Sequence, residues 1–338
     1  MVIKTTDSFC RISFSGRLAW LLVILLYIPL CVGAQVISGK VYRAGTDSII
    51  AHASIYLGGT LTGTTSDKTG AFRLQVLEGK IPLIVSCVGY QSAVINEYSA
   101  DKLLKVYLKP KVNELKTITI NVSSKSREAM ERMFLREFIG TTRNAALCTI
   151  INMDDIELNY SRKTGTLTAS CDKAIEIENK RLGYHISYYL DYFKQHDGTT
   201  SYDGHFVFKD QATDANRKIV KYNREDAYAG SRMQFIRSLW NNTLGDDEFE
   251  IYFQDQYPVS VDSIVHADQQ GAKYISLPYK ISIIYKGDKR SPTDLWQTQK
   301  KCYIDKNGYC EDKLQWVGFM AIQRVGDLLP FEYRPPDE

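Results

Sequence analysis

The chain has 338 residues and a near balance of charges, with 42 Lys and Arg against 39 Asp and Glu and a formal net charge of +3 at pH 7. A chain this close to neutral lacks the excess of positive charge that is typical of nucleic-acid-binding proteins, so we do not expect a nucleic-acid partner. The length is sufficient for two domains with cores of their own.

Residues 1–34 have the pattern of a secretory signal peptide. An apolar run at 18–31 precedes small residues at 32–34, and the basic residues before the run are Lys4, Arg11 and Arg17. The run is about 14 residues, whereas a membrane-spanning helix needs roughly 20. We therefore expect cleavage after Ala34 and no transmembrane segment in the mature chain. An uncleaved anchor and a lipid on Cys31 remain alternatives.

Five cysteines follow the predicted signal peptide, at Cys87, Cys148, Cys171, Cys302 and Cys310. Cys302 and Cys310 flank a strong turn signal at 305–308, so a disulfide across a hairpin is one interpretation. Neither turn register that we considered places the two cysteines opposite each other. Buried free thiols are therefore the other interpretation.

Residues 35–110 alternate apolar and polar side chains in short runs that turn residues interrupt. The expected strands lie at 36–42, 53–57, 71–76, 81–88 and 103–108. Short strands at this spacing indicate an antiparallel β-sandwich.

Asp67, in the stretch S-D-K-T-G at 66–70, could be a metal ligand or only a turn residue. A calcium loop needs further oxygen ligands at alternate positions, which are missing after Gly70. An Asp at the start of a turn accepts hydrogen bonds from backbone N–H groups two residues on, and glycine supplies a positive φ. We interpret Asp67 and Gly70 as a structural turn, and Gly89 with Tyr90 as a second one.

A linker strand is expected within 111–125, and a second domain at 126–338. Apolar residues three and four apart predict a helix over 127–138, and a similar pattern over 225–239 predicts one helix or two short ones. Alternating strands surround both helical regions. The second domain should be α+β with a mostly antiparallel sheet, which makes the whole protein mainly β.

No motif in the second domain identifies a reaction or a cofactor. None of the five histidines has a Glu three residues later, so a zinc carboxypeptidase signature is missing. Ser231 lacks the Gly-x-Ser-x-Gly surroundings of a hydrolase nucleophile and is typical of a helix N-cap. We therefore assign no catalytic residue, no metal ligand and no cofactor. Asp246, Asp247 and Glu248 form an acidic cluster that a hydrolase could use, although such runs are usually solvated loops.

Tyrosine is the compositional excess, with 22 residues. Exposed tyrosines could stack on sugars or anchor a protein partner, while ordinary sheet packing is the alternative. The candidate binding surface consists of Tyr184, Tyr188, Tyr228 and Arg232.

Two parts of the chain resemble known families. The succession V-I-S-G-K-V, A-S-I-Y-L, G-T-T-S-D-K-T-G-A-F-R-L and L-I-V-S-C-V-G-Y resembles the carboxypeptidase-like regulatory domain, a transthyretin-like (prealbumin-like) β-sandwich. The stretches E-I-E-N-K-R-L-G-Y-H-I-S-Y, A-Y-A-G-S-R-M-Q-F-I-R-S-L and W-V-G-F-M-A-I-Q-R-V-G-D-L-L-P-F-E-Y resemble the α+β region of uncharacterised envelope proteins, which follows that domain directly.

The resemblance implies a location and an architecture rather than a reaction. It implies an exported, noncatalytic protein of the periplasm or outer membrane of a Gram-negative cell. We therefore expect the sandwich to serve for docking or as a spacer, and the second domain to bind an envelope protein or a glycan. The alternative is an unrecognised hydrolase acting on peptide or glycan through the second domain.

Overall fold

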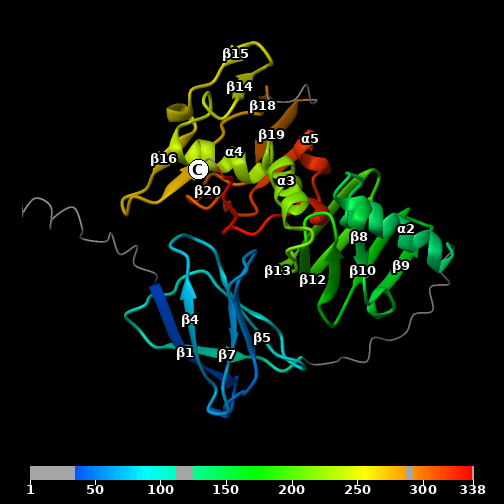
Figure 1. Cartoon of the computed structure of the whole chain (residues 1–338), viewed down its shortest axis with the longest axis vertical. Helices are drawn as coiled ribbons and strands as arrows, with labels where there is room; N and C mark the ends of the chain where they lie inside the picture. Colours follow the sequence, from blue (N-terminus) through cyan, green and yellow to red (C-terminus); the bar gives the residue numbers. More distant parts are fainter. Residues whose placement is uncertain (1–34, 112–124, 287–291, 337–338) are drawn as a thin grey trace, which may run out of the picture. The chain divides into compact units, whose positions relative to one another are not determined.

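The computed structural model describes residues 35–111, 125–286 and 292–336 (Figure 1). The predicted signal peptide at 1–34 lies outside the described residues, as does the linker strand at 115–122. The described residues are mainly β and form several sheets, most of them antiparallel, as the sequence indicated.

The N-terminal domain is a sandwich of two sheets. One sheet has the strand order β4-β1-β7 and the other β3-β2-β5-β6. Within this sandwich β1 and β7 pair in parallel, and the other strand pairs are antiparallel as expected. The strands are β1 (Gln35–Arg43), β2 (Ser54–Leu57), β3 (Gly63–Thr65), β4 (Ala71–Val76), β5 (Leu83–Ser86), β6 (Ala93–Ile95) and β7 (Leu104–Leu108).

The period-two pattern of the strands fills the core of the sandwich. Along β4, Phe72, Leu74 and Val76 are buried while the residues between them face outward. Gly39 on β1 allows β7 to approach, since a Cβ there would lie 2.5 Å from the carbonyl oxygen of Leu104.

A second sheet has the order β8-β11-β12-β10-β9, and β13 pairs along β12. Figure 1 shows helix α2 against this sheet, where the ring of Phe138 meets Tyr188 and Phe193 at centroid distances of 4.9 and 6.4 Å. The elements are α2 (Arg127–Phe138), β8 (Cys148–Ile150), β9 (Glu157–Ser161), β10 (Thr166–Ser170), β11 (Ile175–Asn179), β12 (Tyr184–His196) and β13 (Thr199–Asp210).

Two further sheets follow the helices α3 (Arg217–Tyr228) and α4 (Arg232–Asn241). The larger one has the order β15-β14-β18-β19-β21 and the smaller one β16-β17-β20. The strands are β14 (Phe249–Phe253), β15 (Tyr257–Pro258), β16 (Val265–Ala267), β17 (Lys273–Ile275), β18 (Ile281–Tyr285), β19 (Thr293–Gln297), β20 (Cys302–Tyr303) and β21 (Leu314–Gly318), followed by α5 (Phe319–Ile322). Short 3₁₀ turns lie at Ala145–Leu147, Met153–Asp155, Val261–Ser263 and Val325–Asp327.

The region predicted as one second domain contains two hydrophobic cores. One joins α2 to the sheet of β8–β13 and includes Phe134, Phe138 and Phe193. The other joins α4 to the later strands and includes Phe235 and Phe249. The sandwich has a third core of its own.

Backbone hydrogen bonds join the turn after β2 to later parts of the chain. The N–H of Gly59 donates to the carbonyl of Phe206 at 2.6 Å, and the N–H of Phe208 donates to the carbonyl of Thr60 at 2.8 Å. The N–H of Phe331 donates to the carbonyl of Gly59 at 2.9 Å. The turn therefore extends the hydrogen-bonded network of β13.

In the described ranges, every helix is too short or too polar to cross a membrane.

A candidate ligand-binding cleft

The two turns expected in the sandwich have the geometry of turns. Asp67 Oδ1 accepts hydrogen bonds from the N–H groups of Thr69 at 2.7 Å and Ala71 at 3.0 Å. A further bond from the Thr69 hydroxyl is the largest of the causes that lower the pKa of Asp67. Gly70 has a φ of 73° and Gly89 a φ of 84°. Because Asp67 bonds to its own turn, it is built into the scaffold.

Gly89 and Tyr90 lie in the second turn. The N–H of Tyr90 donates to the carbonyl of Cys87 at 3.1 Å, and Tyr90 forms an isolated antiparallel β-bridge with Pro110. Its ring packs against the core of the sandwich.

Three members of the predicted tyrosine surface lie in the core, which corrects that prediction. Tyr184, Tyr188 and Tyr228 are only 2%, 3% and 4% exposed. Tyr184 and Tyr188 share the inward face of β12 with Ile186, because side chains on a strand alternate between its two faces. Of the four predicted residues, only Arg232 reaches a cleft.

The acidic run at 246–248 lies in the loop between α4 and β14, and Asp246 and Glu248 are exposed. Asp247 accepts a hydrogen bond from the Thr243 hydroxyl. Among the described residues, no group of three His, Cys, Asp or Glu side chains is arranged to hold a metal ion.

Cys302 and Cys310 are free thiols in the structure. The structure therefore agrees with the interpretation as free thiols and not with a disulfide across the hairpin. Cys310 pairs with Ile304 across the hairpin, and the thiol of Cys302 donates to the carbonyl of Glu311 at 3.3 Å. Burial raises the pKa of Cys302 to about 12, which keeps the thiol protonated and unreactive.

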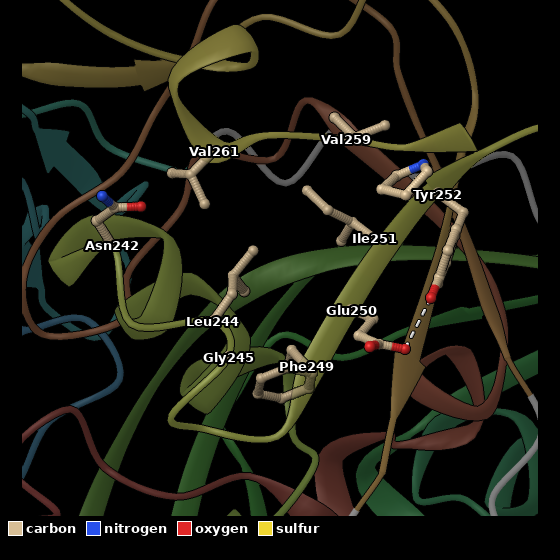
Figure 2. Close-up of a pocket in the computed structure, with 10 residues that line it drawn as sticks. Asn242, Leu244, Gly245, Phe249, Glu250, Ile251, Tyr252, Val259 and Val261 are labelled. Carbon is tan, nitrogen blue, oxygen red and sulfur yellow. Dashed lines mark hydrogen bonds between the residues drawn. The ribbon is translucent and has the colours of Figure 1, made fainter. Parts of the chain in front are cut away.

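A small pocket of about 350 Å³ lies between the end of α4 and strand β14. Figure 2 shows its largely aliphatic wall and the hydrogen bond of 2.8 Å from the Tyr252 hydroxyl to Glu250. Glu250 also forms an ion pair with Lys286 at 2.5 Å. Because the one acidic group at this pocket is already paired, the pocket offers little for a polar ligand. The residues drawn as its lining include Leu244, Phe249, Ile251, Val259 and Val261.

A larger cleft of about 1060 Å³ runs beside β21, the terminal strand in the order of its sheet. The start of β13 forms one side of it, and the segment from α5 to Arg324 forms another. Its lining residues include Thr199, Thr200, Ser201, Tyr202, Arg232, Trp296, Thr298, Asp312, Gln315, Trp316, Val317, Phe319 and Arg324.

Four aromatic side chains line the cleft, and each is partly buried. Trp316 packs edge-on against Phe235 of the core at 6.2 Å, and Tyr202 packs against Phe138 at 5.4 Å. These contacts hold the rings in place. The other two aromatic residues are Trp296 and Phe319.

Arg232, the first residue of α4, lies in the same cleft. Its Nε donates to the carbonyl of Met320 at 2.8 Å, and its guanidinium carbon lies 5.4 Å from the centroid of the Trp316 ring. Burial lowers the pKa of Arg232, yet in the part of the chain that the structure describes no carboxylate lies within 4 Å of its nitrogens. The cation is therefore fixed in position without an ion pair.

Other charges lie near Arg232. The guanidinium carbon of Arg324 lies 5.8 Å from the Tyr202 ring centroid, and its Nη2 lies 3.8 Å from Oε2 of Glu137. Asp312 also lines the cleft, where loss of solvation and then the neighbouring Asp203 raise the pKa of its carboxyl. The cleft thus combines aromatic faces, hydroxyl groups and two arginines.

Sequence reasoning missed this cleft, apart from Arg232. Its walls come from four parts of the chain, at residues 198–202, at Arg232, at residues 296–298 and at residues 312–324, and no local pattern joins them. The available signal was a pair of tryptophans, Trp296 and Trp316, in strands of the C-terminal region.

Residues 37–120 match the family model of the CarboxypepD_reg-like domain. The sandwich is therefore a domain of this family, as the resemblance implied, and the match extends ten residues beyond the boundary expected at 110. No curated protein matches the chain at a significant level.

Proposed function

We propose that the protein is an exported, noncatalytic component of a Gram-negative cell envelope whose second domain binds a glycan in the large cleft. The sandwich serves for docking or spacing. The aromatic lining of the cleft is the observation that carries the proposal, because aromatic rings offer flat apolar faces together with polar edges that sugars can use.

The shape and lining of the cleft favour a glycan over a flat protein interface. Its volume of about 1060 Å³ lies just above the range of about 300–1,000 Å³ usual for small-molecule sites. Hydroxyl and amide groups of Thr200, Thr298 and Gln315 lie among the aromatic side chains. A sugar chain needs this mixture, since each ring has both C–H faces and hydroxyl groups.

The binding test uses the mature chain, residues 35–338, and a panel of envelope-derived oligosaccharides in isothermal titration calorimetry. Trp296→Ala should weaken binding at least about tenfold, because stacking on an aromatic ring is lost. Trp296 is suited to the test because it is only partly buried, whereas the adjacent Leu295 is the residue that packs in the hydrophobic core. Removing the Trp296 side chain should therefore leave the core intact. Tyr222→Ala is the matched control, since Tyr222 is 65% exposed on α3 and does not line the cleft.

Three results would change the proposal. Equal binding by Trp296→Ala and by the unchanged protein would remove the cleft as the binding site. Binding of envelope peptides but of no oligosaccharide would favour a protein partner. Release of shortened glycan or peptide products would favour the hydrolase.

Export is tested separately, by expressing the full chain in a Gram-negative host and fractionating the cells. The proposal expects the protein in the periplasmic or outer-membrane fraction with Gln35 as its first residue. Protein that remains inside the cell with residues 1–34 attached would contradict export.

A further inference from the structure

The large cleft contains a cation, Arg232, that forms no ion pair within 4 Å among the described residues. Arg232 has one hydrogen bond, from Nε to the carbonyl of Met320, and the outer nitrogens Nη1 and Nη2 have none among the described residues. By contrast, Arg224 on the neighbouring helix has both of its outer nitrogens on Asp210, at 3.0 Å each.

A desolvated charge without a counter-charge is costly, and proteins normally pair such groups. Arg324, a second cation, adds to the burial that lowers the pKa of Arg232, and Asp312 opposes this lowering only from beyond ion-pair distance. Arg324 has Glu137 at 3.8 Å, whereas the charge of Arg232 has no carboxylate as near. An anion in the cleft would supply what Arg232 lacks.

We propose that the glycan carries a carboxylate, as sugar acids do, and that Arg232 binds it through Nη1 and Nη2. This inference rests on the glycan-binding function proposed above and adds the chemical class of the ligand. The Met320 carbonyl holds the guanidinium by its Nε edge and leaves the outer edge available, and two parallel N–H groups match the two oxygens of a carboxylate.

The other charges in the cleft favour a carboxylate over a phosphate. Asp312 lines the cleft, and Glu137 lies beside Arg324. A phosphate monoester carries up to two negative charges near neutral pH and would be repelled more strongly by these acids than a singly charged carboxylate. Trp316, stacked near Arg232, would place a sugar ring next to the anion site.

The test compares three forms of the same oligosaccharides, which differ only at C6: the carboxylate, its methyl ester and the neutral hydroxymethyl form. We expect the unchanged protein to bind the carboxylate form at least about tenfold more tightly than the other two. Arg232→Gln should remove this preference, so that the carboxylate form binds the variant no more tightly than the neutral form does. The preference should also weaken as salt is added, because it depends on charge.

Two further variants control for structure and for general charge. Arg232→Lys keeps the positive charge but loses the planar fork, so it should retain only part of the preference. Arg217→Gln removes an exposed arginine of α3 outside the cleft and should change nothing. Thermal unfolding of each variant shows whether it is folded.

Each outcome decides between the two proposals. If the neutral form binds as well as the carboxylate form, or if Arg232→Gln keeps the preference, the carboxylate inference is wrong and glycan binding stands. If phosphorylated oligosaccharides bind more tightly than the carboxylates, the anion is a phosphate and the inference is also wrong. If no oligosaccharide of any form binds, both the inference and the proposed function fail.

Discussion

The guanidinium of Arg232 lies over the ring of Trp316, with 5.4 Å between the guanidinium carbon and the ring centroid. The first residue of α4 thereby meets the edge strand β21 at the wall of the large cleft. A cation over an indole face is attracted by the ring quadrupole. The place where α4 begins therefore decides where the charge of the cleft lies.

The start of α4 is fixed by a reciprocal pair of side-chain caps. Ser231 Oγ accepts from the N–H of Gln234 at 3.1 Å, and Gln234 Oε1 accepts from the N–H of Gly230 at 2.7 Å. Ser231→Ala should lower the free energy of unfolding by about 0.5–2 kcal/mol, because an N–H at the helix start loses its acceptor. Urea unfolding measures this change.

Ser260→Ala is the matched control for the cap. Ser260 precedes the 3₁₀ turn at Val261–Ser263, but its side chain makes no capping bond. Its substitution should change the free energy of unfolding by less than about 0.5 kcal/mol. Equal effects of the two substitutions would show that the bond to Gln234 contributes nothing specific.

The spacing of apolar residues predicted the helices whose formation depends on nearby residues. The helix predicted at 127–138 is α2, with matching bounds, and Ser126 Oγ caps it by accepting from the N–H of Ala129 at 3.3 Å. The alternative of two short helices over 225–239 is also confirmed, because Gly230, with a φ of 68°, separates α3 from α4. α3 nevertheless begins at Arg217, before the predicted region.

The features that the sequence did not reveal depend on contacts between distant residues. β13 follows β12 and pairs along its whole length, yet its polar, glycine-containing sequence has little strand pattern. The cleft is formed where β13, α4 and β21 meet, which no periodicity encodes. The burial of Tyr184 and Tyr188, by contrast, could have been read from their alternation with Ile186.

Asp67 stabilises the sandwich in its ionised form. Hydrogen bonds from the Thr69 hydroxyl, and then from backbone N–H groups, hold the pKa of Asp67 below its ordinary value. The stabilisation is thus complete at pH values above the pKa that Asp67 has in the unfolded chain. It is lost as the pH falls through the lower pKa that Asp67 has in the folded protein. Asp67→Ala should therefore destabilise the protein at neutral pH, and the difference from the unchanged protein should shrink on acidification. Urea unfolding over a series of pH values follows it.

Asp47→Ala controls for the loss of an acidic residue in the same domain. Asp47 is exposed, and the structure gives its side chain no hydrogen bond. Its substitution should change the free energy of unfolding by less than about 0.5 kcal/mol at neutral pH. Oligosaccharide binding should survive Asp67→Ala, and its abolition at unchanged stability would contradict a purely structural role.

Five thiols of the described chain should be detectable without a reductant. Burial raises the pKa of both Cys148 and Cys302 to about 12, so these two thiols should react only slowly with iodoacetamide in the folded protein. In denaturant all five should be alkylated, namely Cys87, Cys148, Cys171, Cys302 and Cys310. Mass spectrometry counts the adducts. Only three adducts in denaturant, with Cys302 and Cys310 protected until a reductant is added, would show a disulfide instead.

Asp305 is a buried acid that joins the hairpin after β20 to the sandwich. Only 2% of it is exposed, and its Oδ2 accepts from the N–H of Lys80 at 3.0 Å. Its Oδ1 accepts from the N–H groups of Asn307 and Tyr309 at 2.8 and 3.1 Å. Asp305→Ala removes the acceptor of all three donors, and each buried donor left unpaired costs about 1–3 kcal/mol. We expect a loss of at least about 2 kcal/mol in urea unfolding.

The pH dependence separates the charge of Asp305 from its hydrogen bonds. Burial raises the pKa of Asp305 in the folded protein, which favours the protonated form there. The bound proton contributes fully to stability at pH values below the pKa that Asp305 has in the unfolded chain. This contribution is lost as the pH rises through the higher pKa that Asp305 has in the folded protein. Asp305→Ala should lack that loss, so its disadvantage relative to the unchanged protein should be largest in acid. A disadvantage that instead grows with pH would mean that the hydrogen bonds to the carboxylate outweigh its burial.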